Sequence, residues 1–143
     1  MAAVAPGATT LRSGSGSTST NGVAGETITP FQWLYIDASD SNKLKLAINT
    51  TAATAALVGV SLTYAATDEK VFYIPVAVGS QTNYIAASGA TWTQGETYVV
   101  SNVAGQLWLA EDTATGDFVT IAGVAASTTS LMLLNTPTGL AAP

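Results

Sequence analysis

The chain carries one sequence pattern twice, about seventy residues apart. In each copy a Gly-Glu-Thr triplet (residues 25–27 and 95–97) leads into an apolar run with a tryptophan, an acidic turn, a Gly-Val pair and a second apolar run. Trp33 and Trp108 occupy matching places in this alignment. Because 143 residues suffice for one well-buried core but not for two, we expect the copies to share a core. The predicted halves are about residues 25–79 and 95–139.

Strand patterns dominate both halves. Residues 43–49 alternate polar and apolar side chains strictly, as a half-buried strand does. Other runs of strand length are rich in β-branched and aromatic residues: 31–36, 71–78, 97–100, 106–110, 118–121 and 130–134. Turn-forming residues separate them at 38–42, 67–69, 87–89, 102–105 and 113–117. The sequence predicts an all-β fold, a compact sandwich or barrel built from two related modules.

One segment permits two interpretations. Asn49 or Thr50 could cap a short helix through Leu57 that ends at Gly59. The alternative is a strand of small residues that continues into residues 57–60. The sequence favours the strand slightly.

The composition suggests contacts with other proteins. Charged residues make up 9% of the chain, against about 25% in ordinary soluble domains, while Ser and Thr number 34. Hydroxyl-rich surfaces with few charges pack readily against protein neighbours, because little charge has to be desolvated. A weakly charged secreted or coat domain would have the same composition.

The charge balance argues against two classes of partner. A net charge of −5 and a pI near 4.2 disfavour nucleic acid, which binds clustered basic residues; the pair Lys43 and Lys45 is too small for that role. No stretch of about 18 apolar residues is present to span a membrane. The N-terminus lacks the pattern of a secretory signal, so we expect synthesis in a cytoplasm.

Residues 1–24 differ from the rest. They are rich in Gly, Ser, Thr and Ala, and residues 13–22 have the composition of a flexible linker. Such a segment could be a disordered tail, but fully extended it would reach about 80 Å. We favour an extended N-terminal arm that docks on neighbouring subunits, with Leu11, Arg12 and Ser13 as its contact residues, followed by a β domain over 25–143.

Residues for catalysis are scarce. Without His or Cys, the usual nucleophile–base pairs and the commonest zinc ligands are missing. The carboxylate pairs that remain all lie in predicted turns: Asp37 with Asp40, Asp68 with Glu69, and Glu111 with Asp112. Residues 37–42 offer oxygens for a calcium ion, but not with the spacing of an EF-hand. We expect no enzyme activity, no cofactor and no metal.

Trp92 lies in the predicted connector between the copies. An exposed tryptophan there could anchor a partner or, together with Tyr84, stack on a sugar. The alternative is a side chain that covers the edge of the core.

The order of these motifs resembles the capsid cement (head decoration) proteins of tailed bacteriophages. The likeness covers about residues 25–139. It is carried by short motifs at residues 35–38, 57–62 and 71–74 in the first half and at 105–112 and 121–126 in the second. The resemblance implies a small all-β protein on the outer surface of a phage capsid. Such proteins are often trimers, and many reach capsid subunits with an extended terminal arm.

The leading hypothesis is therefore a structural virion protein, made in the host cytoplasm. It would bind the outer capsid surface as a homotrimer and cement neighbouring major capsid protein subunits. The alternative is a carbohydrate-binding or adhesive β module of the tail-fibre or surface type.

Overall fold

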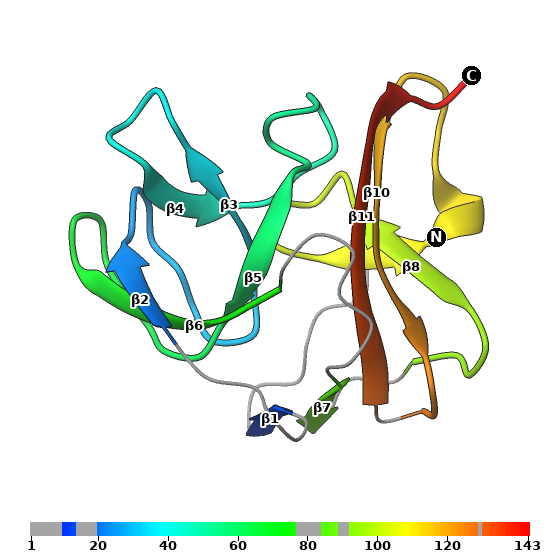
Figure 1. Cartoon of the computed structure of the whole chain (residues 1–143), viewed down its shortest axis with the longest axis horizontal. Coiled ribbons are helices and arrows are strands. Elements are labelled where there is room, and N and C mark those ends of the chain that lie inside the picture. Colours follow the sequence, from blue (N-terminus) through cyan, green and yellow to red (C-terminus); the bar gives the residue numbers. More distant parts are fainter. Residues whose placement is uncertain (1–9, 14–19, 77–83, 89–91, 129) are drawn as a thin grey trace.

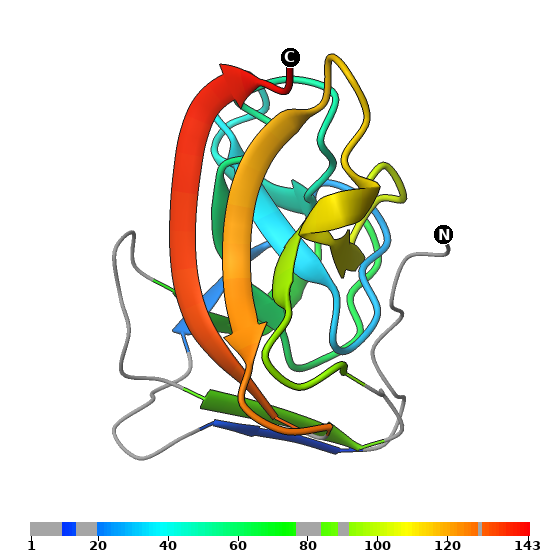
Figure 2. The ribbon, with the colours of Figure 1, turned by 90° about the vertical axis from the view of Figure 1, so that its right-hand side faces the viewer.

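The protein is all-β, with two curled antiparallel sheets. The structure, a computed structural model, describes residues 10–13, 20–76, 84–88, 92–128 and 130–143. Within these residues the one helical element is a single 3-10 turn, η1 (Ala110–Asp112). The two sheets face each other across a shared core, and β1 and β7 form a ribbon at one end of the molecule (Figures 1 and 2).

Sheet A has six strands and sheet B has five. In spatial order, sheet A consists of β1 (Thr10–Ser13), β7 (Tyr84–Ser88), β11 (Ser130–Ala141), β10 (Phe118–Ala125), β8 (Thr97–Val100) and β9 (Leu107–Leu109). Sheet B consists of β2 (Thr20–Val23), β6 (Lys70–Pro75), β5 (Leu57–Ser61), β3 (Trp33–Asp37) and β4 (Lys43–Leu46).

The two sheets contain the same five-stranded unit. Sheet B has the order β2-β6-β5-β3-β4, and sheet A repeats it as β7-β11-β10-β8-β9. We call these units module 1 (β2–β6) and module 2 (β7–β11). The remaining strand, β1, belongs to neither module. The predicted all-β fold of two related modules is confirmed.

A shared bulge fixes the residue-level match between the modules. In module 1, Gly59 lies opposite Leu34, and the next pair skips Val58. In module 2, Gly123 lies opposite Tyr98, and the next pair skips Ala122. An extra residue of this kind bends the strand and increases its twist. Both sheets are therefore curled at the same point.

This register corrects the alignment made from the tryptophans. Tyr35 pairs with Lys45, and its counterpart Val99 pairs with Trp108, so Trp108 corresponds to Lys45. Trp33 corresponds to Thr97. The predicted equivalence of the two tryptophans is wrong, whereas the equivalence of the two Gly-Val pairs is right.

Each module also begins before its Gly-Glu-Thr triplet. β2 pairs with β6 along its whole length, just as β7 pairs with the start of β11. Ala24 is fully buried and bridges Leu44 of β4, which curls sheet B until its two edge strands meet. Residues 20–24, assigned to the arm from their composition, are part of module 1.

Three further predictions needed correction. Residues 50–55 form neither helix nor strand but a turn in which Thr51 and Thr54 exchange side-chain hydrogen bonds. Ala87 and Ser88, expected in a turn, belong to β7. The strand predicted at 43–49 ends at Leu46, because the chain then turns toward module 2, where Asn49 N–H donates to the carbonyl of Ser101.

The modules pack on each other head to tail. The inner face of module 1, the face toward which sheet B curls, is filled by Ala24, Ile28 and Ala65 from its own connections. The corresponding face of module 2 carries Tyr98, Leu107 and Leu131 and is filled largely by the outer face of module 1, with Trp33, Leu57, Val60 and Ile74. The main core thus forms between the outer face of module 1 and the inner face of module 2.

Asn135 of β11 fastens this interface. Its side chain is fully buried, and its Nδ2 donates to the carbonyl oxygens of Leu57 (2.7 Å) and Val76 (2.6 Å) in module 1. Its φ of +43° lies in the left-handed region, which Asn tolerates better than most residues. One side chain of module 2 therefore satisfies two buried acceptors at the end of the β5–β6 ladder.

Candidate functional site

The predicted arm residues lie on a strand. Leu11, Arg12 and Ser13 belong to β1, where they are paired with Ala87, Ala86 and Ile85 of β7. Tyr84 is the first residue of β7 and is paired with Met132 of β11. The fold therefore gathers four of the five proposed interface residues into one small ribbon. The rest of the predicted arm, residues 1–9 and 14–19, lies outside the described residues.

Trp92 is not an exposed platform. Its side chain is 1% exposed and packs in the main core. The ring meets Tyr98 edge to face, with centroids 4.9 Å apart, and the Tyr98 hydroxyl accepts a hydrogen bond from Thr93 N–H. A buried ring cannot stack on a sugar, so the prediction of Trp92 as a surface anchor is wrong. The alternative interpretation, a cover for the core, agrees with the structure.

The most acidic turn is neutralised by lysines. Lys45 Nζ lies 2.8 Å from Asp37 Oδ2 and 3.1 Å from Asp40 Oδ2, and Lys43 Nζ lies 2.7 Å from Asp68 Oδ1. The hydrogen bond from Lys45, followed by that from Ser39, lowers the pKa of Asp37 to about 2. The same contact with Asp37 raises the pKa of Lys45. These groups form a network of ion pairs at the surface.

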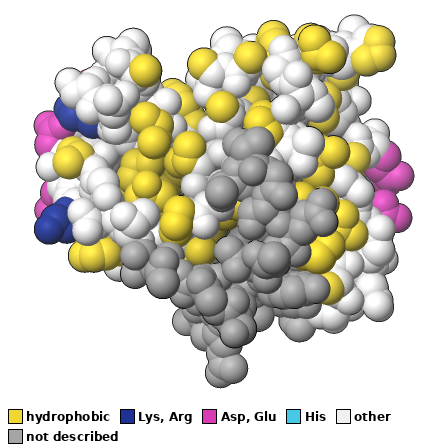
Figure 3. Space-filling model, in the orientation of Figure 1, with side chains coloured by type: hydrophobic (Ala, Val, Ile, Leu, Met, Phe, Trp, Pro, Cys, Tyr) yellow, Lys and Arg dark blue, Asp and Glu magenta, His cyan; other side chains and the backbone are white. Residues whose placement is uncertain are grey.

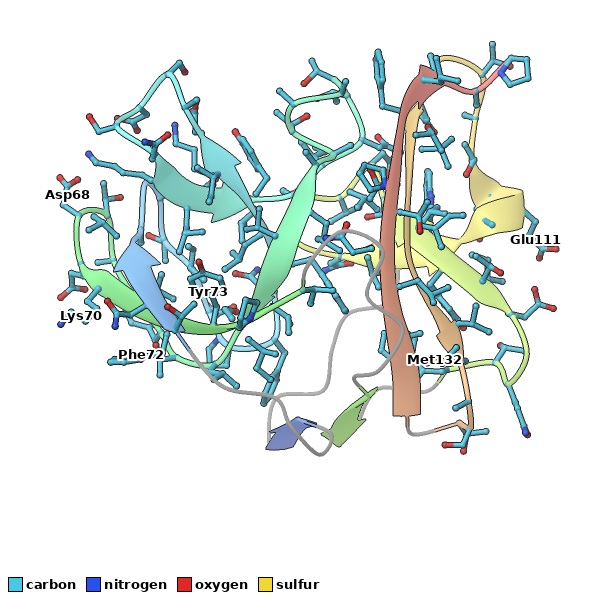
Figure 4. The ribbon with its side chains drawn as sticks, viewed as in Figure 1. Asp68, Lys70, Phe72, Tyr73, Glu111 and Met132 are labelled. Atoms are coloured by element: carbon cyan, nitrogen blue, oxygen red, sulfur yellow. The ribbon has the colours of Figure 1, made fainter. Side chains whose placement is uncertain are left out.

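The other candidate carboxylates are engaged separately. Glu69 Oε1 accepts a hydrogen bond from Ala66 N–H. Glu111 lies on η1, at the side of the molecule opposite Asp68 (Figure 4). Among the described residues no group of three or more acidic side chains is placed to hold a metal ion. Lys43 bridges Asp40 (3.6 Å) and Asp68 (2.7 Å), so two of the predicted carboxylate pairs meet as ion-pair partners of one lysine, and Glu111 lies apart from them.

The outer face of module 2 is an apolar surface that the sequence did not reveal. Ile121, Val124 and Met132 correspond to Leu57, Val60 and Ile74 of module 1, as the shared bulge shows. The three module 1 residues are 1–3% exposed because module 2 covers them. The module 2 residues are only partly buried. We call Ile121, Val124 and Met132 the outer apolar face; Met132 is labelled beside β10 in Figure 4.

Apolar side chains also reach the surface of module 1. Val23 of β2 is 45% exposed and Phe72 of the adjacent strand β6 is 40% exposed. In Figure 3, hydrophobic side chains gather over the part of this view where sheet B lies, and the charged groups stand at the two margins. The described part of this face therefore carries few charged side chains away from its margins.

Comparison with known proteins gives no family for the chain. No protein-family model matches the sequence, and no curated protein matches it. Within the described residues, no helix is long and apolar enough to cross a bilayer.

Proposed function

We propose that the chain is a non-catalytic structural protein of a phage head. It binds the outer surface of the capsid and cements neighbouring major capsid protein subunits. The observation that carries the proposal is the outer apolar face of module 2. The corresponding outer face of module 1 is buried in the main core.

Physical reasons favour a protein partner for this face. The strands of this face, β10 and β11, contain no Lys, Arg, Asp or Glu. The outer apolar face therefore has no charged neighbour on its own strands. An apolar surface of this kind loses little on desolvation and gains from burial, at roughly 25 cal/mol per Å² of apolar area. A capsid surface supplies such a partner in many copies, and several modest contacts add up when copies are joined.

The proposal is tested by placing charge on the outer apolar face. The variant Val124→Glu should keep most of the thermal stability of the parent, because that side chain is already partly exposed. Its occupancy on purified shells of the phage that encodes it should fall at least tenfold.

The matched control is Ile36→Glu, which adds the same charge at an exposed apolar residue of module 1. We expect that variant to bind shells as the parent does. Full occupancy by Val124→Glu, or a parent protein that does not bind shells, would contradict the proposal.

A further inference from the structure

The strand β1 is an addition to an otherwise complete fold. Module 1 has all five strands of the repeated unit and no counterpart of β1, so the repeated unit does not require such a strand. Among the described strands, β7 is the one with which β1 forms a ladder. In both ribbon views the pair lies at one end of the molecule (Figures 1 and 2). Few contacts of the body therefore depend on where β1 comes from.

The two modules protect their first strands in different ways. In module 1, the chain just after β2 bridges β4, and Gly25 N–H donates to the carbonyl of Leu44. In module 2, the edge of β7 is covered by β1. The sequence of β7, Tyr-Ile-Ala-Ala-Ser, contains no charge and no proline, the devices that normally prevent an edge from pairing with other chains. This edge needs a strand, and β1 is the strand that fits it.

The connection between β1 and β2 permits more than one partner. Residues 14–19 consist of Gly, Ser and Thr alone, and seven Cα–Cα steps from Ser13 to Thr20 reach about 25 Å at most. A tether of this length and composition keeps a strand near its own acceptor at roughly millimolar effective concentration. Copies held side by side in an assembly exceed that concentration, and exchange of an identical element then costs little.

We propose that neighbouring copies of this chain exchange β1, so that Thr10–Ser13 of one copy pairs with the β7 edge of the next. The exchanged strand keeps the register of the single chain, with Leu11 opposite Ala87 and Arg12 opposite Ala86. It joins the copies without any new interface on the modules. The inference deepens the proposed function, from which it takes only the premise that the chain works as an assembly of copies.

Disulfide trapping tests the exchange, because the chain has no cysteine of its own. One chain carries Leu11→Cys and a second chain carries Ala87→Cys, and the two are produced together and oxidised. Opposed residues in an antiparallel pair have Cα atoms about 4.5–5.5 Å apart, within the range that a disulfide spans. We expect covalent mixed dimers on a non-reducing gel, at least five times as many at about millimolar protein as at micromolar.

Two further pairs complete the test. Arg12→Cys with Ala86→Cys shifts the link by one residue, so one of the two pairs has the closer Cα spacing. Leu11→Cys with Thr115→Cys is the control for random collision, since Thr115 is exposed in the turn after η1. Circular dichroism verifies that each variant is folded.

The outcomes separate cleanly. Mixed dimers well above the control, from either register pair, support strand exchange. Mixed dimers at the control level from both pairs overturn it, as does the absence of any link when both cysteines of a register pair are placed in one chain. The trapping experiment uses purified protein alone, so its result does not depend on whether the protein binds shells. A failure of strand exchange likewise leaves the shell-binding test unaffected.

Discussion

Module 1 and module 2 share their strand order and their glycine bulge, yet their surroundings differ. Module 1 fills its inner face with its own connections and presents its outer face to module 2. Module 2 receives that face and leaves the corresponding one of its own only partly covered. A duplicated sequence therefore specified two copies of one fold, but their head-to-tail packing made one surface into a core and the other into a candidate interface.

The largest expected effect is at the contact that joins the modules. Asn135→Ala would leave the carbonyls of Leu57 and Val76 without their donor and should lower the free energy of unfolding by about 4 kcal/mol, since each orphaned buried acceptor costs roughly 1–3 kcal/mol. Denaturant unfolding measures this loss. Thr138→Ala removes an exposed hydrogen bond within module 2 and should cost under about 1 kcal/mol. Equal losses in the two variants would show that Asn135 does not fasten the modules.

The glycine bulge tests whether the modules are equivalent. A Cβ at Gly59 would overlap the carbonyl oxygen of Ile74, and a Cβ at Gly123 would overlap that of Met132. Gly59→Ala and Gly123→Ala should each destabilise the protein by about 2–3 kcal/mol, because a rigid backbone atom cannot move aside cheaply.

Gly25→Ala is the comparison for that pair of changes. Its Cβ would first meet the flexible side chain of Lys45, so we expect a smaller loss in the same unfolding measurement. A severe effect at Gly59 with none at Gly123 would break the equivalence between the modules.

The smallest expected effect on stability comes from the Asp37–Lys45 ion pair of module 1, and it depends on pH. The pKa of Asp37 is lowered to about 2 from its ordinary value of 3.8, so its ion pair with Lys45 stabilises the folded state fully above about pH 4. That contribution is lost as the pH falls through 2, because the unfolded state takes up the proton first. Module 2 has Trp108 in place of Lys45 and lacks this pair.

Thermal melting between pH 5 and pH 2 checks the assignment. The parent should lose stability more steeply than Asp37→Asn over this range, and the two curves should converge at the acidic end. Parallel curves across the whole range would mean that the Asp37–Lys45 pair contributes nothing measurable to stability.

The sequence located strands well wherever side-chain pattern and turn residues agreed. Residues 97–100 were predicted with their observed bounds, and the strand predicted at 71–78 appears as β6. β2 was missed because its Asn21-Gly22 pair is typical of a turn, and here tertiary pairing with β6 overrides that preference. β7 was hidden for a similar reason, since small residues such as Ala86 and Ala87 have weak strand propensity.

The candidate site was harder to predict. Leu11, Arg12, Ser13 and Tyr84 were named one by one, but only the sheet order shows that they share a ribbon. Trp92 was proposed for a surface because it stands between two copies in the chain. It is buried because its ring packs on the inner face of module 2, as Ile28 packs on that of module 1. The outer apolar face gave no signal, since its residues have the ordinary pattern of a half-buried strand.

By itself the sequence determined the β class, the duplication and most of the strands, because period-two alternation, glycines and turn residues act over a few neighbouring positions. The tertiary structure alone decided the register of the copies, the burial of Trp92, the neutralised acidic turn and the face that stays uncovered. These features depend on which face of one sheet meets which face of another. Two strands with the same pattern cannot encode that choice locally, since it is set by contacts between residues as far apart as Leu57 and Asn135.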